Sequence, residues 1–267
     1  MAAWEGVLPQ ELWKEKAREG PLMKFYEFSE KNEKTLLLVH GMATTWKMSF
    51  SSLIQEASKY YHLIVVALDG HNEGETDEFI SLQEEAEKIE KYVMSKHSGK
   101  IDAVYGSSLG GAIVLQILDN NKIEITKAVL DSTYATDYGA LSRLATKIMT
   151  ALSMKMISGE SKIMRKMMGI EDKESVNDLM YTKISKITLG NCFYTSYTYK
   201  LPEGISKIQT EIEFWYGSKE TFPCKFAKKL MKQLPNMKVR VFEGYGHGEI
   251  LKNTEQLVIE LDKFYSN

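Results

Sequence analysis

Short apolar segments alternate with longer amphipathic segments along most of the chain. We expect buried strands where the apolar segments lie, at residues 35–39, 63–68, 101–105, 127–131, 211–216 and 238–242. An earlier segment, 22–29, alternates apolar with polar residues and is expected to form an outer strand. Strands that are apolar on both faces and separated by helices are typical of a parallel sheet with helices on its faces.

The segments between these strands have apolar residues at helical spacing. The clearest is 81–97, in which Leu82, Ala86, Ile89 and Val93 fall on one face of a helix. Further helices are expected at 109–119, 224–234 and 249–264. The pattern therefore predicts an α/β fold with a mostly parallel central sheet.

One long region, from residue 132 to residue 208, contains no convincing buried strand. Within it, residues 141–170 have a helical pattern and hold many of the chain's 14 methionines, so the region is too apolar to be a linker. We predict a helical cap at 132–208, lying over the carboxyl edge of the sheet. The cap is inserted into a core that consists of residues 1–131 and 209–267.

The composition is that of an ordinary soluble globular protein, with 43% hydrophobic and 26% charged residues. The net charge of −2 predicts no general attraction to nucleic acids or to membranes. The first twenty residues lack the apolar stretch of a signal peptide, and Cys192 and Cys224 are too few for a disulfide framework or a cysteine-rich zinc site. We expect a cytoplasmic protein that is a monomer or a homodimer.

A glycine-flanked serine lies between the predicted strand at 101–105 and the predicted helix at 109–119. Ser108 is the centre of the sequence Gly106-Ser107-Ser108-Leu109-Gly110, which has the spacing Gly-x-Ser-x-Gly. A sharp turn from strand to helix needs small flanking residues, and it holds the central side chain out at the carboxyl edge of the sheet. Ser108 is therefore the candidate nucleophile, and Ser107 is expected to be a supporting residue.

With this motif, three other segments resemble those of the α/β-hydrolase family. The sequence LLLVHGM (36–42) resembles the family's His-Gly element, and VVALDGHNEGET (65–76) resembles its Asp-x-x-Gly-His-Gly-x-Ser loop in a degraded form. The sequence FEGYGHGE (242–249) resembles the loop that carries the catalytic histidine. The resemblance covers the chain from about residue 22 onward and implies a serine hydrolase.

Among the five histidines, His247 is the candidate base. It lies in a glycine-rich loop between the last predicted strand and the last predicted helix, which places it at the same sheet edge as Ser108. Imidazole accepts and returns a proton near neutral pH. We expect His62 and His97 to be structural and His71 to hold the shape of its loop. His40 lies in the expected oxyanion loop, where the backbone is expected to contribute more than the side chain.

An acid is expected to orient His247 and to stabilise its cation. The family places this acid in a Gly-x-x-Asp turn, and the corresponding residues here run from Gly217 to Glu220. The resemblance thus implies Glu220, with glutamate in place of aspartate. Asp131, at the end of a predicted strand, and Glu243, near the histidine loop, remain alternatives.

Backbone amides are expected to hold the oxygen that becomes negative during acyl transfer. By resemblance, these are the amides of Leu109 and Met42. Trp46 and Met48 follow the second of these positions and are expected to line the pocket. In the predicted cap, aromatic residues that include Tyr194 and Tyr197 are expected to offer substrate both apolar area and hydrogen bonds.

Two groups of side chains in the predicted cap leave alternatives open. An adaptable apolar surface that either packs on the core or contacts substrate is expected from Met149, Met154, Met156, Met164, Met167 and Met168. A locally basic surface that is either a solvated face or a site for an anionic substrate is expected from Lys147, Lys155, Lys162, Arg165 and Lys166.

These residues together predict a serine hydrolase that cleaves carboxylic esters with an apolar acyl or alcohol part through an acyl-enzyme. No metal or organic cofactor is expected. The alternatives are a thioesterase or amidase with the same site, or a ligand-binding protein without catalysis on the same fold.

Overall fold

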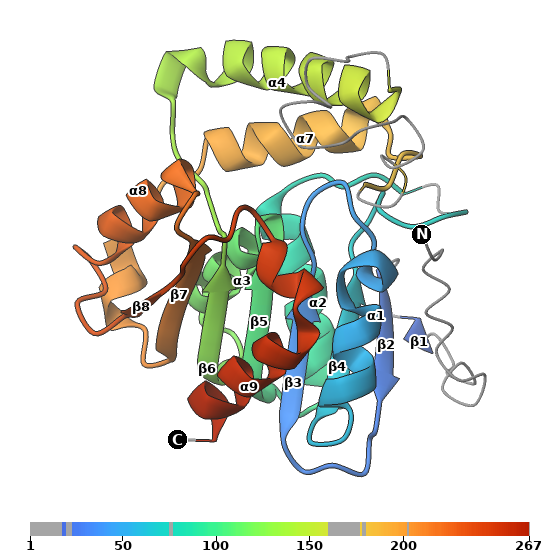
Figure 1. Ribbon diagram of the computed structural model, residues 1–267, viewed down its shortest axis with the longest axis vertical. Coiled ribbons are helices and arrows are strands. Elements are labelled where there is room, and N and C mark those ends of the chain that lie inside the picture. The colour runs from blue at the N-terminus through green and yellow to red at the C-terminus, as the bar shows by residue number, and fades with distance from the viewer. Residues whose placement is uncertain are drawn as a thin grey trace.

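The computed structural model describes residues 18–19, 23–74, 77–159, 177, 180–201 and 203–266. Its centre is an eight-stranded sheet with the order β1-β2-β4-β3-β5-β6-β7-β8 (Figure 1). The strands are β1 (Arg18–Glu19), β2 (Lys24–Phe28), β3 (Thr35–Val39), β4 (His62–Ala67), β5 (Lys100–Ser107), β6 (Glu124–Asp131), β7 (Glu211–Gly217) and β8 (Lys238–Phe242). Strands β3 to β8 run parallel, and β2 pairs antiparallel with β4. The predicted α/β fold with a mostly parallel sheet is confirmed.

Helices cover both faces of the sheet. One face carries α2 (Leu82–Lys96), α3 (Leu109–Asn120) and α8 (Thr221–Leu230), and the other carries α1 (Trp46–Ala57) and α9 (Thr254–Tyr265). The strands are apolar on both faces because both faces are covered. In β3, for example, Leu36 to Val39 are all fully buried.

Helix α1 is an element that the sequence analysis did not predict. Its buried residues are Trp46, Phe50, Leu53, Ile54 and Ala57, which have the spacing of one helical face. The helix begins after Thr45, whose hydroxyl accepts a hydrogen bond from the Met48 amide at 3.1 Å. The sequence does contain a signal for this helix, because Thr45 is a favourable N-cap residue and apolar residues at helical spacing follow it.

Between β6 and β7, the described residues form two α-helices that lie above the carboxyl ends of the parallel strands (Figure 1). These are α4 (Ser142–Ile157) and α7 (Lys186–Tyr197), and a short 3-10 helix, Glu203–Lys207, follows them. Residues 132–208 remain a proposed cap domain. Near the end of this range, Tyr199 and Ile205 are buried in the same hydrophobic cluster as the sheet.

Helix α7 is fastened to the loop that leads into α2. The Phe79 amide donates to Thr188 Oγ1 at 3.1 Å, and the Asn191 side chain donates to the Phe79 carbonyl at 2.8 Å. The Leu82 amide donates to Thr195 Oγ1 at 3.2 Å. Side chains of α7 therefore satisfy backbone groups before and at the start of α2 and fix the height of α7 above the sheet. Of the helices formed by described residues, none has the length and apolar character that crossing a bilayer requires.

Candidate active site

Ser108 lies at the turn between β5 and α3. Its backbone has φ 53° and ψ −112°, a conformation that residues with a β-carbon rarely adopt. A Cβ placed on Gly106 would lie 2.7 Å from the Gly110 carbonyl oxygen, and one on Gly110 would lie 2.1 Å from the Val39 carbonyl oxygen. The two glycines are therefore required by the close approach of β5, α3 and β3. The turn holds Ser108 at the carboxyl edge of the sheet.

Replacing Gly110 by alanine is expected to lower the free energy of unfolding by about 3 kcal/mol or more, because backbone must move to admit the new methyl group. Chemical denaturation followed by circular dichroism measures this change. Gly190→Ala is the matched control: Gly190 lies in α7, and a Cβ there would be 3.7 Å from the nearest atom. We expect the control to be neutral or stabilising by up to about 1 kcal/mol. A Gly110→Ala protein as stable as wild type would contradict the close-approach argument.

The loop after β8 brings His247 to Ser108. The distance between His247 Nε2 and Ser108 Oγ is 3.1 Å, and the distance between His247 Nδ1 and Glu220 Oε1 is 2.7 Å. A carboxylate only accepts hydrogen bonds, so Nδ1 carries the proton and Nε2 is free to accept from the serine hydroxyl. This is the tautomer that a general base for Ser108 requires.

The remaining histidines are buried or paired elsewhere. Burial lowers the pKa of His40 to about 3 and that of His71 to about 4, so both rings are neutral. His71 Nδ1 donates to the Asp69 carbonyl at 2.9 Å, within its own loop. His62 Nε2 lies 2.7 Å from Glu27, at the far end of β4 from the site.

Glu220 follows β7 and is held by several donors. Its side chain is 4% exposed, and its Oε2 accepts from the Gly217 amide at 2.7 Å and from Ser132 Oγ at 2.8 Å. Burial opposes the negative charge of Glu220, but the hydrogen bonds from His247 and from Gly217 outweigh it and hold its pKa below the usual value. Glu220 is thus an ionised partner for His247.

The hydrogen bonds of the two alternative acids go to residues other than His247. Asp131 is buried, and it accepts from Tyr105 at 2.6 Å and from Ser132 at 3.1 Å. Burial raises the pKa of Asp131 to about 6. The Ser132 hydroxyl lies 3.1 Å from Asp131 and 2.8 Å from Glu220, and its single proton is donated to one of these carboxylates at a time. Glu243 accepts from Ser218 on the surface.

The candidate oxyanion donors lie on either side of Ser108. Leu109 is the first residue of α3, so its amide has no partner within the helix. The loop after β3 passes directly beside Ser108, since a Cβ on Gly41 would lie 3.3 Å from Ser108 Cβ. Met42, the next residue, lines the same pocket as Leu109.

A pocket of about 570 Å³ opens from Ser108 and His247 toward α4 and α7. Its walls are largely apolar and aromatic and include Met42, Leu109, Tyr134, Leu189, Phe193 and Phe222. Ser153 of α4 contributes to its upper side. The site thus has room for an apolar group of substrate next to the serine hydroxyl.

Solved structures with the same arrangement of elements come from several organisms. An α/β hydrolase family protein from Desulfitobacterium hafniense aligns with a TM-score of 0.79 at 22% identity, over 91% of this chain and all of that chain. A carboxylesterase structure from Nitrososphaera gargenis has a TM-score of 0.72 at 14% identity, over 94% of this chain and 97% of that chain. MenH from S. aureus has a TM-score of 0.70 at 17% identity, over 92% of this chain and 100% of that chain.

The chain has the α/β-hydrolase fold. No protein-family model matches the sequence, and no curated protein matches it. The likeness therefore establishes the fold, which the motifs around Ser108 and His247 had implied.

In this α/β-hydrolase fold, several residues expected in the pocket lie elsewhere. Trp46 is the first residue of α1; it is 3% exposed and stacks on Tyr26 within the core. Met48 lies on the outer side of α1 and is exposed. Tyr194 is exposed on α7, whereas Tyr197 lines the pocket. The expected pocket roles of Trp46, Met48 and Tyr194 are therefore corrected, because helical geometry turns these side chains away from Ser108.

The predicted methionine surface is only partly within the described residues. Met149, Met154 and Met156 lie on α4 and are absent from the pocket walls, and Met154 packs in a small cluster with Ile157 and Leu189. Met164, Met167, Met168, Lys162, Arg165 and Lys166 lie outside the described residues. Among the pocket residues that sequence reasoning missed, Tyr134 lies in the loop after β6, and Phe222 lies in the first turn of α8, which follows β7. Both therefore lie near the carboxyl ends of parallel strands, where ligand sites form.

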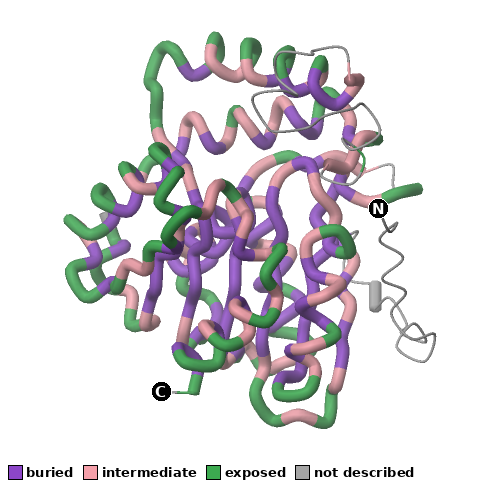
Figure 2. The backbone as a smooth tube through the Cα atoms, in the orientation of Figure 1, coloured by how far each residue is buried: buried purple, intermediate pink, exposed green. Residues whose placement is uncertain are grey.

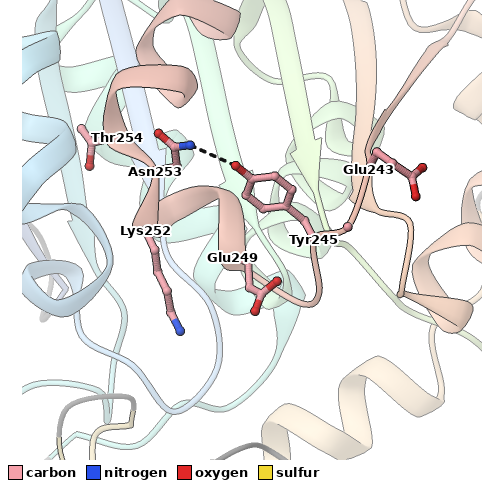
Figure 3. Close-up of a pocket in the computed structure, with 7 residues that line it drawn as sticks. Glu243, Tyr245, Glu249, Lys252, Asn253 and Thr254 are labelled. Atoms are coloured by element: carbon pink, nitrogen blue, oxygen red, sulfur yellow. Dashed lines mark hydrogen bonds between the residues drawn. The ribbon is translucent and has the colours of Figure 1, made fainter.

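A second hollow lies beside the histidine loop, between the end of β8 and the start of α9 (Figure 3). Its side chains are polar, and Asn253 donates to Tyr245 Oη at 2.9 Å. Neither Ser108 nor His247 lines it. This hollow contains none of the reactive groups described above.

Proposed function

We propose that the protein is a serine hydrolase that cleaves carboxylic esters with an apolar acyl or alcohol part. The observation that carries the proposal is the hydrogen-bonded chain from Ser108 through His247 to the buried Glu220. The apolar pocket beside Ser108 supports an apolar substrate. The solved structures of the same fold include esterases and other hydrolases, which supports hydrolysis.

The geometry supports the following mechanism. Ser108 Oγ attacks the ester carbonyl carbon while its proton passes to His247 Nε2, and Glu220 stabilises the resulting imidazolium. The amides of Met42 and Leu109 hold the carbonyl oxygen as it becomes negative. His247 then protonates the leaving alcohol, and the acyl group remains on Ser108. Water, deprotonated by His247, attacks the acyl carbon and releases the acid and the free serine.

A fluorophosphonate probe tests whether Ser108 is activated. We expect one adduct in the intact mass, located on Ser108 by peptide mapping. If Ser108 is labelled, the unlabelled protein is then assayed with matched ester, thioester and amide substrates. We expect the ester to be hydrolysed fastest. Preference for the thioester or amide would favour the alternative hydrolases. A folded protein that takes up no probe would favour a ligand-binding protein.

The pH dependence of hydrolysis is expected to follow His247. Burial disfavours the charge on this ring, but its side chain is 58% exposed, and the hydrogen bond and charge of Glu220 raise its pKa above the usual value. Protonated His247 cannot accept the serine proton, so kcat/KM is expected to fall as the pH decreases through this raised pKa. The acid limb of a kcat/KM profile on a non-ionising ester should therefore have its midpoint above about 6.5.

Glu220→Gln provides the matched control for this profile. It removes the negative charge beside His247, so the midpoint of the remaining activity is expected to move to lower pH. A wild-type midpoint at or below about 6.5, or a midpoint unchanged by Glu220→Gln, would contradict the assigned pair.

A further inference from the structure

Over its first three turns, helix α4 presents aliphatic side chains to solvent and hydroxyl groups to the protein, whereas Met156 and Ile157 in its last turn are buried. Between residues 142 and 153 its buried positions are Ser142, Thr150 and Ser153. On the opposite side, Leu144, Ile148 and Leu152 are 57%, 50% and 39% exposed. Their spacing of four residues places them on one stripe of the helix. Figure 2 shows the exposed turns along the outer edge of α4, at the top of the molecule.

This arrangement is the reverse of what water favours for a surface helix. Leu141, immediately before α4, extends the stripe and is 64% exposed. The side-chain hydroxyls of Thr146 and Thr150 are buried and have no hydrogen-bond partner among the described residues. A helix facing only water would gain from the opposite orientation, so the pattern indicates an apolar environment outside α4.

The charges on α4 indicate what that environment is. Arg143, Lys147 and Lys155 are exposed on the helix, and α4 contains no aspartate or glutamate. A second copy docked through the same face about a two-fold axis would bring two sets of cations together. An anionic surface would instead neutralise them. An aliphatic stripe flanked by cations is typical of helices that lie in the interface of a membrane.

We propose that the outer face of α4 docks on an anionic lipid surface. The aliphatic stripe enters the headgroup region, and the three cations meet lipid phosphates and carboxylates. The net charge of −2 predicted no membrane partner for the whole chain, but it averages over the whole surface, whereas α4 presents only cations. Because Ser153 of α4 lines the pocket, docking places the pocket next to esters dissolved in the lipid; this last step alone rests on the proposed function.

Co-sedimentation of the full chain with vesicles tests the proposal. We expect binding to phosphatidylcholine vesicles that contain phosphatidylserine, little binding to phosphatidylcholine alone, and weakening by salt. The triple variant Leu144→Gln, Ile148→Gln, Leu152→Gln is expected to bind at least about tenfold more weakly. For the charge-reversal variant Arg143→Glu, Lys147→Glu, Lys155→Glu, we expect the affinity for anionic vesicles to fall roughly fivefold or more for each cation replaced.

Two double variants that change exposed side chains elsewhere serve as controls. Met94→Gln with Ile259→Gln matches the aliphatic variant, and Lys228→Glu with Lys229→Glu matches the charge reversal. Both are expected to bind like wild type, and thermal unfolding of every variant verifies folding.

The proposal would be overturned if the wild-type protein did not bind anionic vesicles, or if the α4 variants bound them as strongly as wild type. A dimer in sedimentation velocity that the glutamine variant dissociates would also overturn it, since the stripe would then join two copies. Binding is measured without catalysis, so it stands apart from ester hydrolysis.

Discussion

Ser108→Ala is expected to reduce kcat/KM for a reactive ester by at least roughly 10⁴-fold, because it removes the hydroxyl that lies 3.1 Å from His247 Nε2 and would form the acyl-enzyme. The same variant is expected to take up no fluorophosphonate. Burst kinetics with a chromogenic ester add a second measurement: wild type should release one equivalent of alcohol rapidly, and the variant none.

Ser107→Ala is the matched control for this experiment. Ser107 is the adjacent hydroxyl, but it is buried as the last residue of β5. We expect its loss to change kcat/KM by less than about tenfold. Equal losses in the two variants would mean that the turn, and not the Ser108 hydroxyl, is what activity requires.

Glu220→Gln is expected to reduce kcat/KM by roughly 10²- to 10⁴-fold. The wild-type carboxylate accepts from His247 on one oxygen and from Gly217 and Ser132 on the other. A glutamine amide has one oxygen, and the two donors on the Ser132 side favour placing it there. Its NH₂ group then faces His247 Nδ1 and selects the tautomer with a proton on Nε2, which cannot accept from Ser108.

Asp131→Asn is the comparison that decides between the two acids. Asp131 contacts Tyr105 and Ser132, and its carboxylate makes no hydrogen bond to His247. Asparagine has nearly the same shape as aspartate, so we expect kcat/KM to fall by less than about tenfold. A large loss in Asp131→Asn together with a small loss in Glu220→Gln would assign the orienting role to Asp131.

Much of the fold was predictable because buried parallel strands have a strong local signature. Segment 63–68 is apolar throughout and segment 35–39 is apolar after Thr35, and they form β4 and β3 within one residue of the expected ends. The turn at Ser108 was equally visible, because close packing of β5 and α3 leaves glycine as the residue that fits. Loops that follow parallel strands converge on one edge, which is why Ser108 and His247 could be paired before their distance was known. Glu220 came from the resemblance to the α/β-hydrolase family, because this geometry also allows Asp131.

The pocket walls were less predictable because they depend on how helices are oriented. The sequence places Trp46 and Met48 close to Met42, but the N-cap at Thr45 begins α1 there and turns both side chains away from Ser108. Tyr194 and Tyr197 are three residues apart in α7, yet only Tyr197 lines the pocket. The tilt of a helix against its neighbours decides such cases, and tertiary packing sets that tilt.

The left-handed backbone at Ser108 has a consequence for the evolution of this chain. Ala43 and Ser132, which also border the site, share a positive φ, and glycine would adopt it with less strain in each case. Such conformations cost of order 1–3 kcal/mol each. The sequence of greatest thermal resistance on this backbone therefore differs from the sequence that places a hydroxyl beside His247. Under the proposed function, glycine at position 108 would relieve backbone strain but abolish hydrolysis, so stability and activity favour different residues at this turn.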